Sequence, residues 1–504
     1  MRVNDQELVE KLVGLTPAKR QLLRQRLSSV RGKLESPAQQ QITAIPRDGG
    51  TFAASFAQER LWVLSQLIST PAAYNIAAAF DVVGDLDLPR LEAALQALVK
   101  RHEALRTSFE ERDEGLRQVI HATVDLRIKR ENPPSQSPLY GQWIGEFASR
   151  LSLIPFDLGR LPLLRIHVAA LARDHHVLLI VMHHIISDAW STSLMVRELA
   201  EEYSGPARPE SGRRDRIDYV DYALWQRRRF EEGACHAGLQ YWKEKLANCP
   251  ETLELPCDRP RPPKMTYRGH HIIVESNGEF KRGMLLLAQA SQCSPGTLMV
   301  SILQVFLARY TAQMDLTIGV PVANRQHPQS RDIVGLFVNT IVLRQIVNPS
   351  DSFRQHLVRT QSAFLEAQEH QDVPFEKLVE ELRPSRSVAN TPLFEVLFNY
   401  LEDANLQLRL PGTQVREIDY DPGAVRVSLS VDVRSRANEL TFAFQYSEDL
   451  FDRETVEDMA ENFLFFAQEI FSDPGKPLNR YRMIAPKQYA TIVTASSGMQ
   501  GVAR

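Results

Sequence analysis

Two adjacent histidines, His183 and His184, and an aspartate four residues further on, Asp188, come directly after an apolar run at 177–182. A run of six apolar residues predicts a strand that is buried on both faces. Neighbouring side chains of a strand point to opposite faces. One histidine is therefore expected to face the packed interior, while the other is free to face a cavity. We expect a functional site where this strand ends.

The residue types at this site suit proton transfer and helix capping. A histidine can take or give a proton because its ordinary pKa, about 6.5, lies near working pH. Asp188 falls where the pattern of the following residues predicts a helix, so it is expected to cap that helix or to form an ion pair. A second histidine pair, His175 and His176, lies in a predicted polar turn and is expected to be exposed.

Length and charge limit the class of protein. The chain has 504 residues, more than one hydrophobic core usually supports, so two domains or two large lobes are expected. A net charge of -3 argues against broad attraction to nucleic acid or to an anionic membrane. No apolar run approaches the ~18 residues that a membrane span needs, and no signal-peptide core follows the N-terminus. We expect a cytoplasmic monomer that binds neither nucleic acid nor membrane.

No resident metal or cofactor is expected. The four cysteines form no CxxC pair and have no histidine at zinc-finger spacing, so free thiols are expected. The sequence has no serine nucleophile elbow, P-loop or dinucleotide glycine fingerprint, so neither ATP, NAD nor an acyl-enzyme is implied.

Helical and strand patterns alternate along the chain and predict an α/β fold. Alternating apolar residues at 427–433 and 440–446 predict two half-buried strands, and 456–470 has the apolar spacing of a closing helix. We expect four segments: an N-terminal docking or linker helix with its linker at 1–50, a first lobe at 51–225, a second lobe at 226–485 and a tail at 486–504.

Seven segments resemble, in order, the motifs of the condensation domains of nonribosomal peptide synthetases, which belong to the chloramphenicol-acetyltransferase-like superfamily. Residues 183–189 are similar to the HHxxxDG motif, a pattern that other acyltransferases and epimerisation domains of the superfamily share. The resemblance covers about residues 51–480 and implies two chloramphenicol-acetyltransferase-like lobes in a V-shaped pseudo-dimer with a tunnel between them. The other six segments are 55–64, 101–109, 318–325, 333–340, 370–378 and 392–394.

The resemblance implies that an amine attacks an acyl or peptidyl thioester. Both substrates would be held on partner carrier proteins by 4'-phosphopantetheine, next to an adenylation domain. His184 is expected to face the tunnel, either as general base or as the group that holds the amine by a hydrogen bond. The other site residues implied are a buried partner, His183; a structural ion pair, Asp188 with Arg325; a second structural arginine, Arg60; and tunnel residues Ala189, Trp190, Gly335 and Asn339.

Three functions agree with these motifs. The leading one is a peptide-bond-forming condensation domain of the L-donor or lipoinitiating type. A second is a free-standing amide or ester synthase that uses a soluble acceptor. A third is a catalytically weak, condensation-like domain that recruits partners. The presence of His183, His184 and Asp188 favours the first two.

The sequence departs from the family pattern at two places. Ala189 stands where the family has glycine, so it is expected to add a methyl group beside the channel and to limit positive φ. Residues 426–429 read Arg-Val-Ser-Leu where many members have Lys-Phe-Asp-Leu, so the contacts of that aspartate are expected to be lost.

Overall fold

The expected docking helix within 1–50 and most of the expected tail at 486–504 lie outside the described residues. The computed structural model describes residues 41–48, 50–133, 140–205, 216–250, 252–383, 391–402, 407–436 and 439–489.

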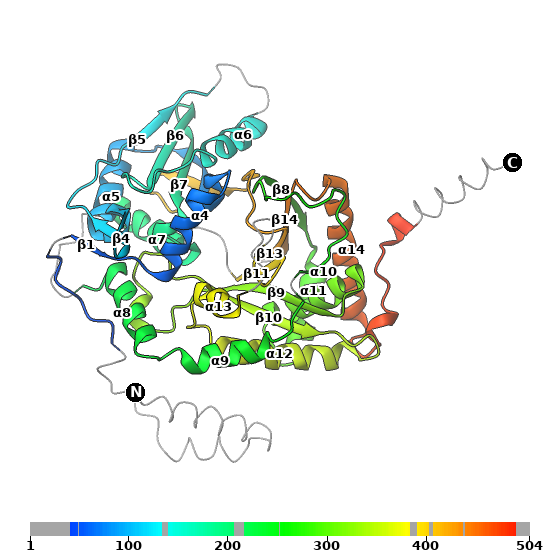
Figure 1. Cartoon of the computed structure of the whole chain (residues 1–504). Helices are drawn as coiled ribbons and strands as arrows, with labels where there is room; N and C mark the ends of the chain where they lie inside the picture. Colours follow the sequence, from blue (N-terminus) through cyan, green and yellow to red (C-terminus); the bar gives the residue numbers. More distant parts are fainter. Residues whose placement is uncertain are drawn as a thin grey trace, which may run out of the picture. The chain divides into compact units, whose positions relative to one another are not determined.

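A five-stranded mixed sheet, in the order β12-β2-β7-β6-β5, forms the centre of the first lobe (Figure 1). All neighbours are antiparallel except β5, which runs parallel to β6. The predicted strand at 177–182 is confirmed as the middle strand, β7. The bounds are β2 (Asn75–Gly84), β5 (Ile128–Glu131), β6 (Leu164–Ala172), β7 (His175–His183) and β12 (Thr413–Ile418).

Helices cover both faces of β7. Val177, Leu179 and Val181 pack in one cluster with side chains of α6. Ile180 and Met182, on the opposite face, lie against side chains of α5 and α7. This alternation places the last strand position, 183, on the α6 face. The helices of the first lobe are α4 (Phe56–Leu67), α5 (Leu88–Arg101), α6 (Tyr140–Ser152) and α7 (Ala189–Ser204).

A six-stranded sheet, in the order β10-β9-β11-β13-β14-β8, forms the second lobe. β11 is parallel to both of its neighbours, and the other pairs are antiparallel. The strands expected at 427–433 and 440–446 are confirmed as β13 and β14. The bounds are β8 (Gly269–Glu275), β9 (Asp315–Val322), β10 (Asn339–Ile346), β11 (Val396–Glu402), β13 (Leu429–Ser435) and β14 (Leu440–Ser447).

Helices pack against this sheet and join the two lobes. The closing helix expected at 456–470 is confirmed within α14, where Phe463 packs on Phe442 and Phe444 of β14. A further small sheet joins β1 (Thr51–Ala53), β4 (Gly115–Ile120) and β3 (Thr107–Arg112). The remaining helices are α8 (Tyr219–Glu231), α9 (His236–Lys245), α10 (Gly278–Ala290), α11 (Pro295–Thr311), α12 (Phe353–Glu369), α13 (Phe375–Leu382) and α14 (Arg453–Ser472).

The predicted turn at His175 and His176 is wrong. Pairing between β6 and β7 continues as far as Ala172 and His175, so both histidines belong to β7. His176 is buried, and Nε2 of His175 lies 2.6 Å from Oδ1 of Asp81. The ladder extends further than the polar composition of this stretch indicates because the turn needs only two residues.

One strand crosses the predicted lobe boundary. β12 belongs to the sequence range 226–485, yet it pairs antiparallel with β2 from Thr413↔Gly84 to Ile418↔Ala79. It thus completes the sheet of the first lobe. No helix among the described residues is both long and apolar enough to span a membrane.

We expect Gly319→Ala to destabilise the protein. Gly319 lies in β9, and a Cβ there would come within 2.6 Å of the ring of Phe394, which is held in the core. Overpacking of this kind should lower the free energy of unfolding by about 1–3 kcal/mol, measured by chemical denaturation. Gly145→Ala in α6, where a Cβ meets nothing within 4 Å, is the matched control and should stabilise by about 0.5–1 kcal/mol.

Candidate active site

His183 ends β7 and points into the protein. Its side chain is 2% exposed, and its Nδ1 accepts a hydrogen bond from the backbone N–H of Ile185 at 3.1 Å. An accepting Nδ1 places the ring proton on Nε2. Burial, and after it the charge of the adjacent His184, lower the pKa of His183 to about 3. The ring is therefore neutral and shapes the turn after β7, which agrees with its expected role.

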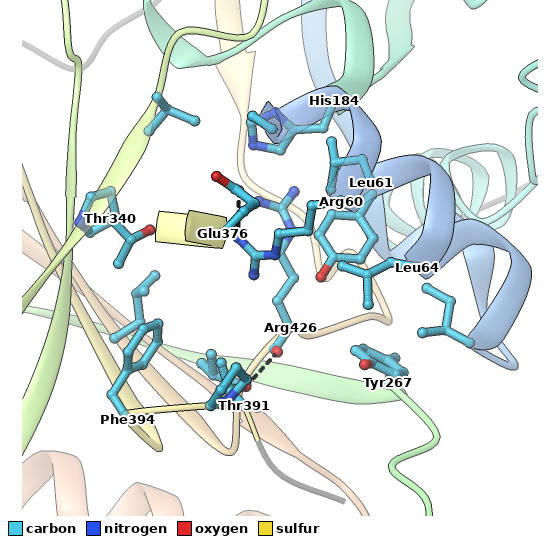
Figure 2. A pocket seen from close by; sticks show the side chains of 18 of the residues that line it. Arg60, Leu61, Leu64, His184, Tyr267, Thr340, Glu376, Thr391, Phe394 and Arg426 are labelled. Atoms are coloured by element: carbon cyan, nitrogen blue, oxygen red, sulfur yellow. Dashed lines mark hydrogen bonds and ion pairs between the residues drawn. The ribbon is translucent and has the colours of Figure 1, made fainter. Parts of the chain in front are cut away.

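His184 turns the other way and lines a cavity (Figure 2). It begins a short 3-10 helix, His184–Ile186, and its Nδ1 donates to the carbonyl oxygen of Ser187 at 2.7 Å. With the proton held on Nδ1, the Nε2 lone pair is free to accept a hydrogen bond. Burial and then the charge of Arg426 lower the pKa of His184 to about 3. The imidazole is thus a neutral acceptor at working pH.

Asp188 caps α7 and forms a buried ion pair. Its Oδ1 accepts from the backbone N–H of Ser191 at 2.7 Å. Nη2 of Arg325 lies 3.2 Å from the same oxygen, and the two side chains are only 3% and 2% exposed. The predicted pair of Asp188 with Arg325 is confirmed.

The same carboxylate fixes a loop of the second lobe. Oδ2 of Asp188 accepts from the backbone N–H groups of Phe337, at 2.9 Å, and Val338, at 3.2 Å. Nη1 of Arg325 donates to the carbonyl of Ile333 at 2.7 Å. The loop between β9 and β10 is therefore tied to the start of α7, and part of it forms a wall of the cavity.

The cavity at His184 has a volume of about 350 Å³. Its walls come from α4, β9, the loop before β10, α13 and the segments that precede β8, β11 and β13. Most of its lining is apolar, as is usual where a small number of polar groups fix a ligand. The polar and charged side chains of the lining are Arg60, Tyr74, His184, Lys264, Tyr267, Asn339, Thr340, Glu376, Thr391 and Arg426.

Arg60 is part of the cavity wall and also a link between helices. Its Nη1 lies 3.6 Å from Oε1 of Glu376, and its guanidinium lies over the ring of Phe375 at 5.0 Å. These contacts join α4 to α13, as expected of a structural arginine. Because Arg60 also lines the cavity, its charge acts on the site as well.

The expected tunnel residues are only partly brought together. Asn339 lines the cavity, and its amide donates to the carbonyls of Gln371 and Val373. Trp190 is 46% exposed and donates through Nε1 to the carbonyl of Arg331, outside this cavity. Gly335 is buried against the ring of Tyr219, where a Cβ would come within 2.0 Å. Gly335 therefore permits close packing and is not a lining residue.

Ala189 also lies outside the lining of the cavity, which corrects its expected position. It is the first residue of α7 and is exposed. It is not among the described residues with positive φ, so its backbone does not require glycine. The methyl group is accommodated because the helix begins there and the side chain points to solvent.

The sequence patterns did not predict three charged lining residues, Lys264, Arg426 and Glu376. In the sequence, Arg426 differs from the family pattern and Glu376 belongs to a motif, but neither feature predicts a place in the cavity wall. The second departure, Ser428, is not without contacts: its hydroxyl donates to Glu395 and accepts from Arg261 at 3.1 Å. No local pattern predicts that Arg426 and Glu376 line the cavity, because their partners, Ala73 and Arg60, come from distant segments.

The fold is that of known condensation-type structures. The X-domain from teicoplanin biosynthesis matches with a TM-score of 0.79 at 24% identity, over 88% of this chain and 100% of that one. The starter condensation domain of rhizomide synthetase, as a mutant in complex with C8-CoA, matches with a TM-score of 0.74 at 21% identity, over 86% and 98% of the two chains. The chain thus has the α/β fold of condensation-type structures.

Residues 49–493 match the family model of the condensation domain, and the chain belongs to that family. Members of this family in nonribosomal peptide synthetases are acyltransferases that form amide bonds. Chondramide synthase cmdD of Chondromyces crocatus is 34% identical over 440 residues, or 86% of this chain. Surfactin synthase subunit 1 of Bacillus subtilis (strain 168) is 33% identical over 444 residues, or 87% of this chain. The chain spans only 11% and 12% of the length of these two relatives.

We expect Arg325→Met to lower the free energy of unfolding by about 3–5 kcal/mol, because it leaves the buried carboxylate of Asp188 without its counter-ion. Arg453→Met is the control, since its pair with Glu457 is exposed and should contribute less than about 0.5 kcal/mol. Chemical denaturation of both variants measures the difference. Equal losses in the two variants would contradict a supporting role for the buried pair.

We expect His184 to remain neutral from pH 8 down to pH 5, because burial lowers its pKa to about 3. Its protonation should therefore begin only as the pH falls toward that value. NMR of protein with ¹³C-labelled histidine measures this, with the His184→Gln variant used to assign the resonance. A midpoint near 6.5 would show that the ring is fully solvated.

Proposed function

We propose that this chain condenses an acyl or peptidyl thioester, carried by one carrier protein, with an amine carried by another. The observation that carries the proposal is the Nε2 of His184, which has no hydrogen-bond partner among the described residues and lies in a largely apolar cavity. Membership of the condensation-domain family supports it. Catalysis of this kind needs an acceptor for the N–H of the amine that stays unprotonated at working pH.

In the proposed reaction the amine nitrogen attacks the carbonyl carbon of the thioester. The π electrons of the carbonyl move to its oxygen, and the tetrahedral intermediate then expels the thiolate. The proton lost by nitrogen is passed to the thiolate, which leaves as a thiol. A pKa of about 3 makes His184 a weak base, so we propose that it holds the neutral amine by a hydrogen bond while the proton leaves.

The partners proposed are donor and acceptor carrier proteins, with an adenylation domain as neighbour. Each carrier would bring its substrate on a 4'-phosphopantetheine arm, which is part of the substrate and not a resident cofactor. The apolar lining suits an apolar acyl group. That the donor is of the L-configured or lipoinitiating type is proposed from the resemblance of the motifs alone. A free-standing synthase with a soluble acceptor and a partner-recruiting domain are the competing functions. The cytoplasmic location expected from the sequence stays a prediction.

We expect His184→Ala to slow transfer from an acyl-loaded carrier to an aminoacyl-loaded carrier by on the order of 10²–10⁴-fold, since the amine loses its hydrogen-bond acceptor. Intact-mass spectrometry of both carriers follows the reaction. His270→Ala is the matched control because His270 is exposed on β8 and pairs with Asp421, outside the cavity. It should transfer at the rate of the unaltered protein.

The other outcomes separate the competing functions. Transfer to free amines but not to a carrier-bound amine would identify a synthase with a soluble acceptor. Binding of carriers without transfer, across varied acyl and aminoacyl groups, would identify a recruiting domain. Unchanged transfer in the His184→Ala variant would remove this histidine from the mechanism.

A further inference from the structure

Arg426 reaches the cavity from the segment just before β13 and is held in a fixed orientation. Its Nε donates to the carbonyl oxygen of Ala73 at 3.1 Å, and its guanidinium lies over the ring of Tyr74 at 5.3 Å. Its own carbonyl accepts a long hydrogen bond from Oγ1 of Thr391 at 3.4 Å. The side chain of Arg426 lines the cavity and extends into it (Figure 2).

Arg426 has no ion-pair partner in the described part of the chain, although the buried carboxylate of Asp432 acts on its charge from a longer distance. Arg60, the other arginine of the lining, has Glu376 as its partner at 3.6 Å, whereas no carboxylate of the described residues forms an ion pair with Arg426. The lining carries three cations, Arg60, Lys264 and Arg426, against the single carboxylate of Glu376. Burial lowers the pKa of Arg426 because a desolvated cation is costly. Such a site favours an incoming negative charge.

Arg426 lies close to the reacting position. After burial, its charge is the largest influence that lowers the pKa of His184, ahead of the charge of Arg60. Figure 2 shows Arg426 extending toward His184 from the opposite wall, beside Arg60 and Glu376. Lys264 is exposed. Among the cations of the lining, Arg426 is thus the one that combines proximity to His184, a fixed orientation and no carboxylate partner.

We infer that Arg426 is a catalytic residue whose guanidinium stabilises the oxyanion formed when the amine adds to the thioester carbonyl. This inference rests on the proposed function. In that step a C–N bond forms, the carbonyl π electrons become the lone pair of an oxyanion beside Arg426, and the amine hydrogen bonds to Nε2 of His184. When the oxyanion collapses, the C–S bond breaks, the carbonyl is restored and the sulfur takes the proton. Atoms and charges balance without a further reactant.

The inferred role agrees with the charge that the reaction needs at each stage. A desolvated cation beside His184 disfavours an ammonium ion there and so favours the neutral amine, which is the nucleophile. The same cation is opposite in sign to the charge that develops on oxygen. A preorganised donor in a site that excludes water stabilises such a charge without reorganisation.

The test compares Arg426→Gln and Arg426→Lys in the transfer assay between loaded carriers. We expect Arg426→Gln to lower kcat by about 10²–10³-fold with little change in KM, because an oxyanion exists only on the way to product. Arg426→Lys keeps the charge and should retain most of the rate. Arg434→Gln is the control, since Arg434 lies on β13 and pairs with Asp419 outside this cavity.

A second measurement distinguishes an electrostatic role from a structural one. Titration of ¹³C-labelled His184 should show a higher pKa in Arg426→Gln than in the unaltered protein, since a positive charge has been removed. The other charged and titratable groups near the ring stay unchanged in this comparison. Arg426→Met keeps an unbranched side chain without the charge and replaces Arg426→Gln if that variant unfolds. The unchanged groups are Arg60, Tyr74, Arg165, His183, Lys264, Tyr267 and Glu376.

The outcomes separate this inference from the proposed function. Failure of the unaltered protein to transfer any acyl group would overturn both. An active protein whose Arg426→Gln variant keeps its kcat would overturn the oxyanion role and leave the proposed function intact. A loss confined to KM, or to substrates that carry a carboxylate, would show that Arg426 binds a substrate anion and would also overturn the inference.

Discussion

The buried carboxylate of Asp188 is the interaction on which the site depends. It caps α7, pairs with Arg325 and accepts two backbone N–H groups from the loop before β10. Each oxygen is thus satisfied where water has little access, which is the condition under which a buried charge pair is tolerated. The same carboxylate therefore holds the segment after β7, the start of α7 and the loop that forms a wall of the cavity. The direction of His184 and the position of that wall depend on this one side chain.

Local patterns predicted the elements that position the histidines. The apolar run at 177–182 predicted β7, and the alternation of a strand separated the direction of His183 from that of His184. Asp188 was predicted as a cap because a helical pattern follows it. These features depend on the periodicity of a few consecutive residues, which a sequence displays directly.

The rest of the site depends on contacts between distant segments. Arg426 hydrogen bonds to Ala73, 353 positions earlier in the chain, and Arg60 meets Glu376 from another helix. Asn339 lines the cavity and Trp190 does not, and this difference likewise depends on which distant segments pack around the cavity. Local periodicity does not predict contacts between distant segments. The charged residues of the cavity wall could therefore be identified only from the folded structure.

The crossing of β12 bears on how domains of this kind could be exchanged between synthetases. A recombination point between residues 226 and 412 would join the first lobe to a foreign β12 and would pair β2 with an unmatched strand. If that pairing failed, the backbone groups along β2 would form an open edge prone to aggregation. Both lobes should therefore be exchanged together. A hybrid made from one lobe of each protein would need a β12 that pairs correctly with β2.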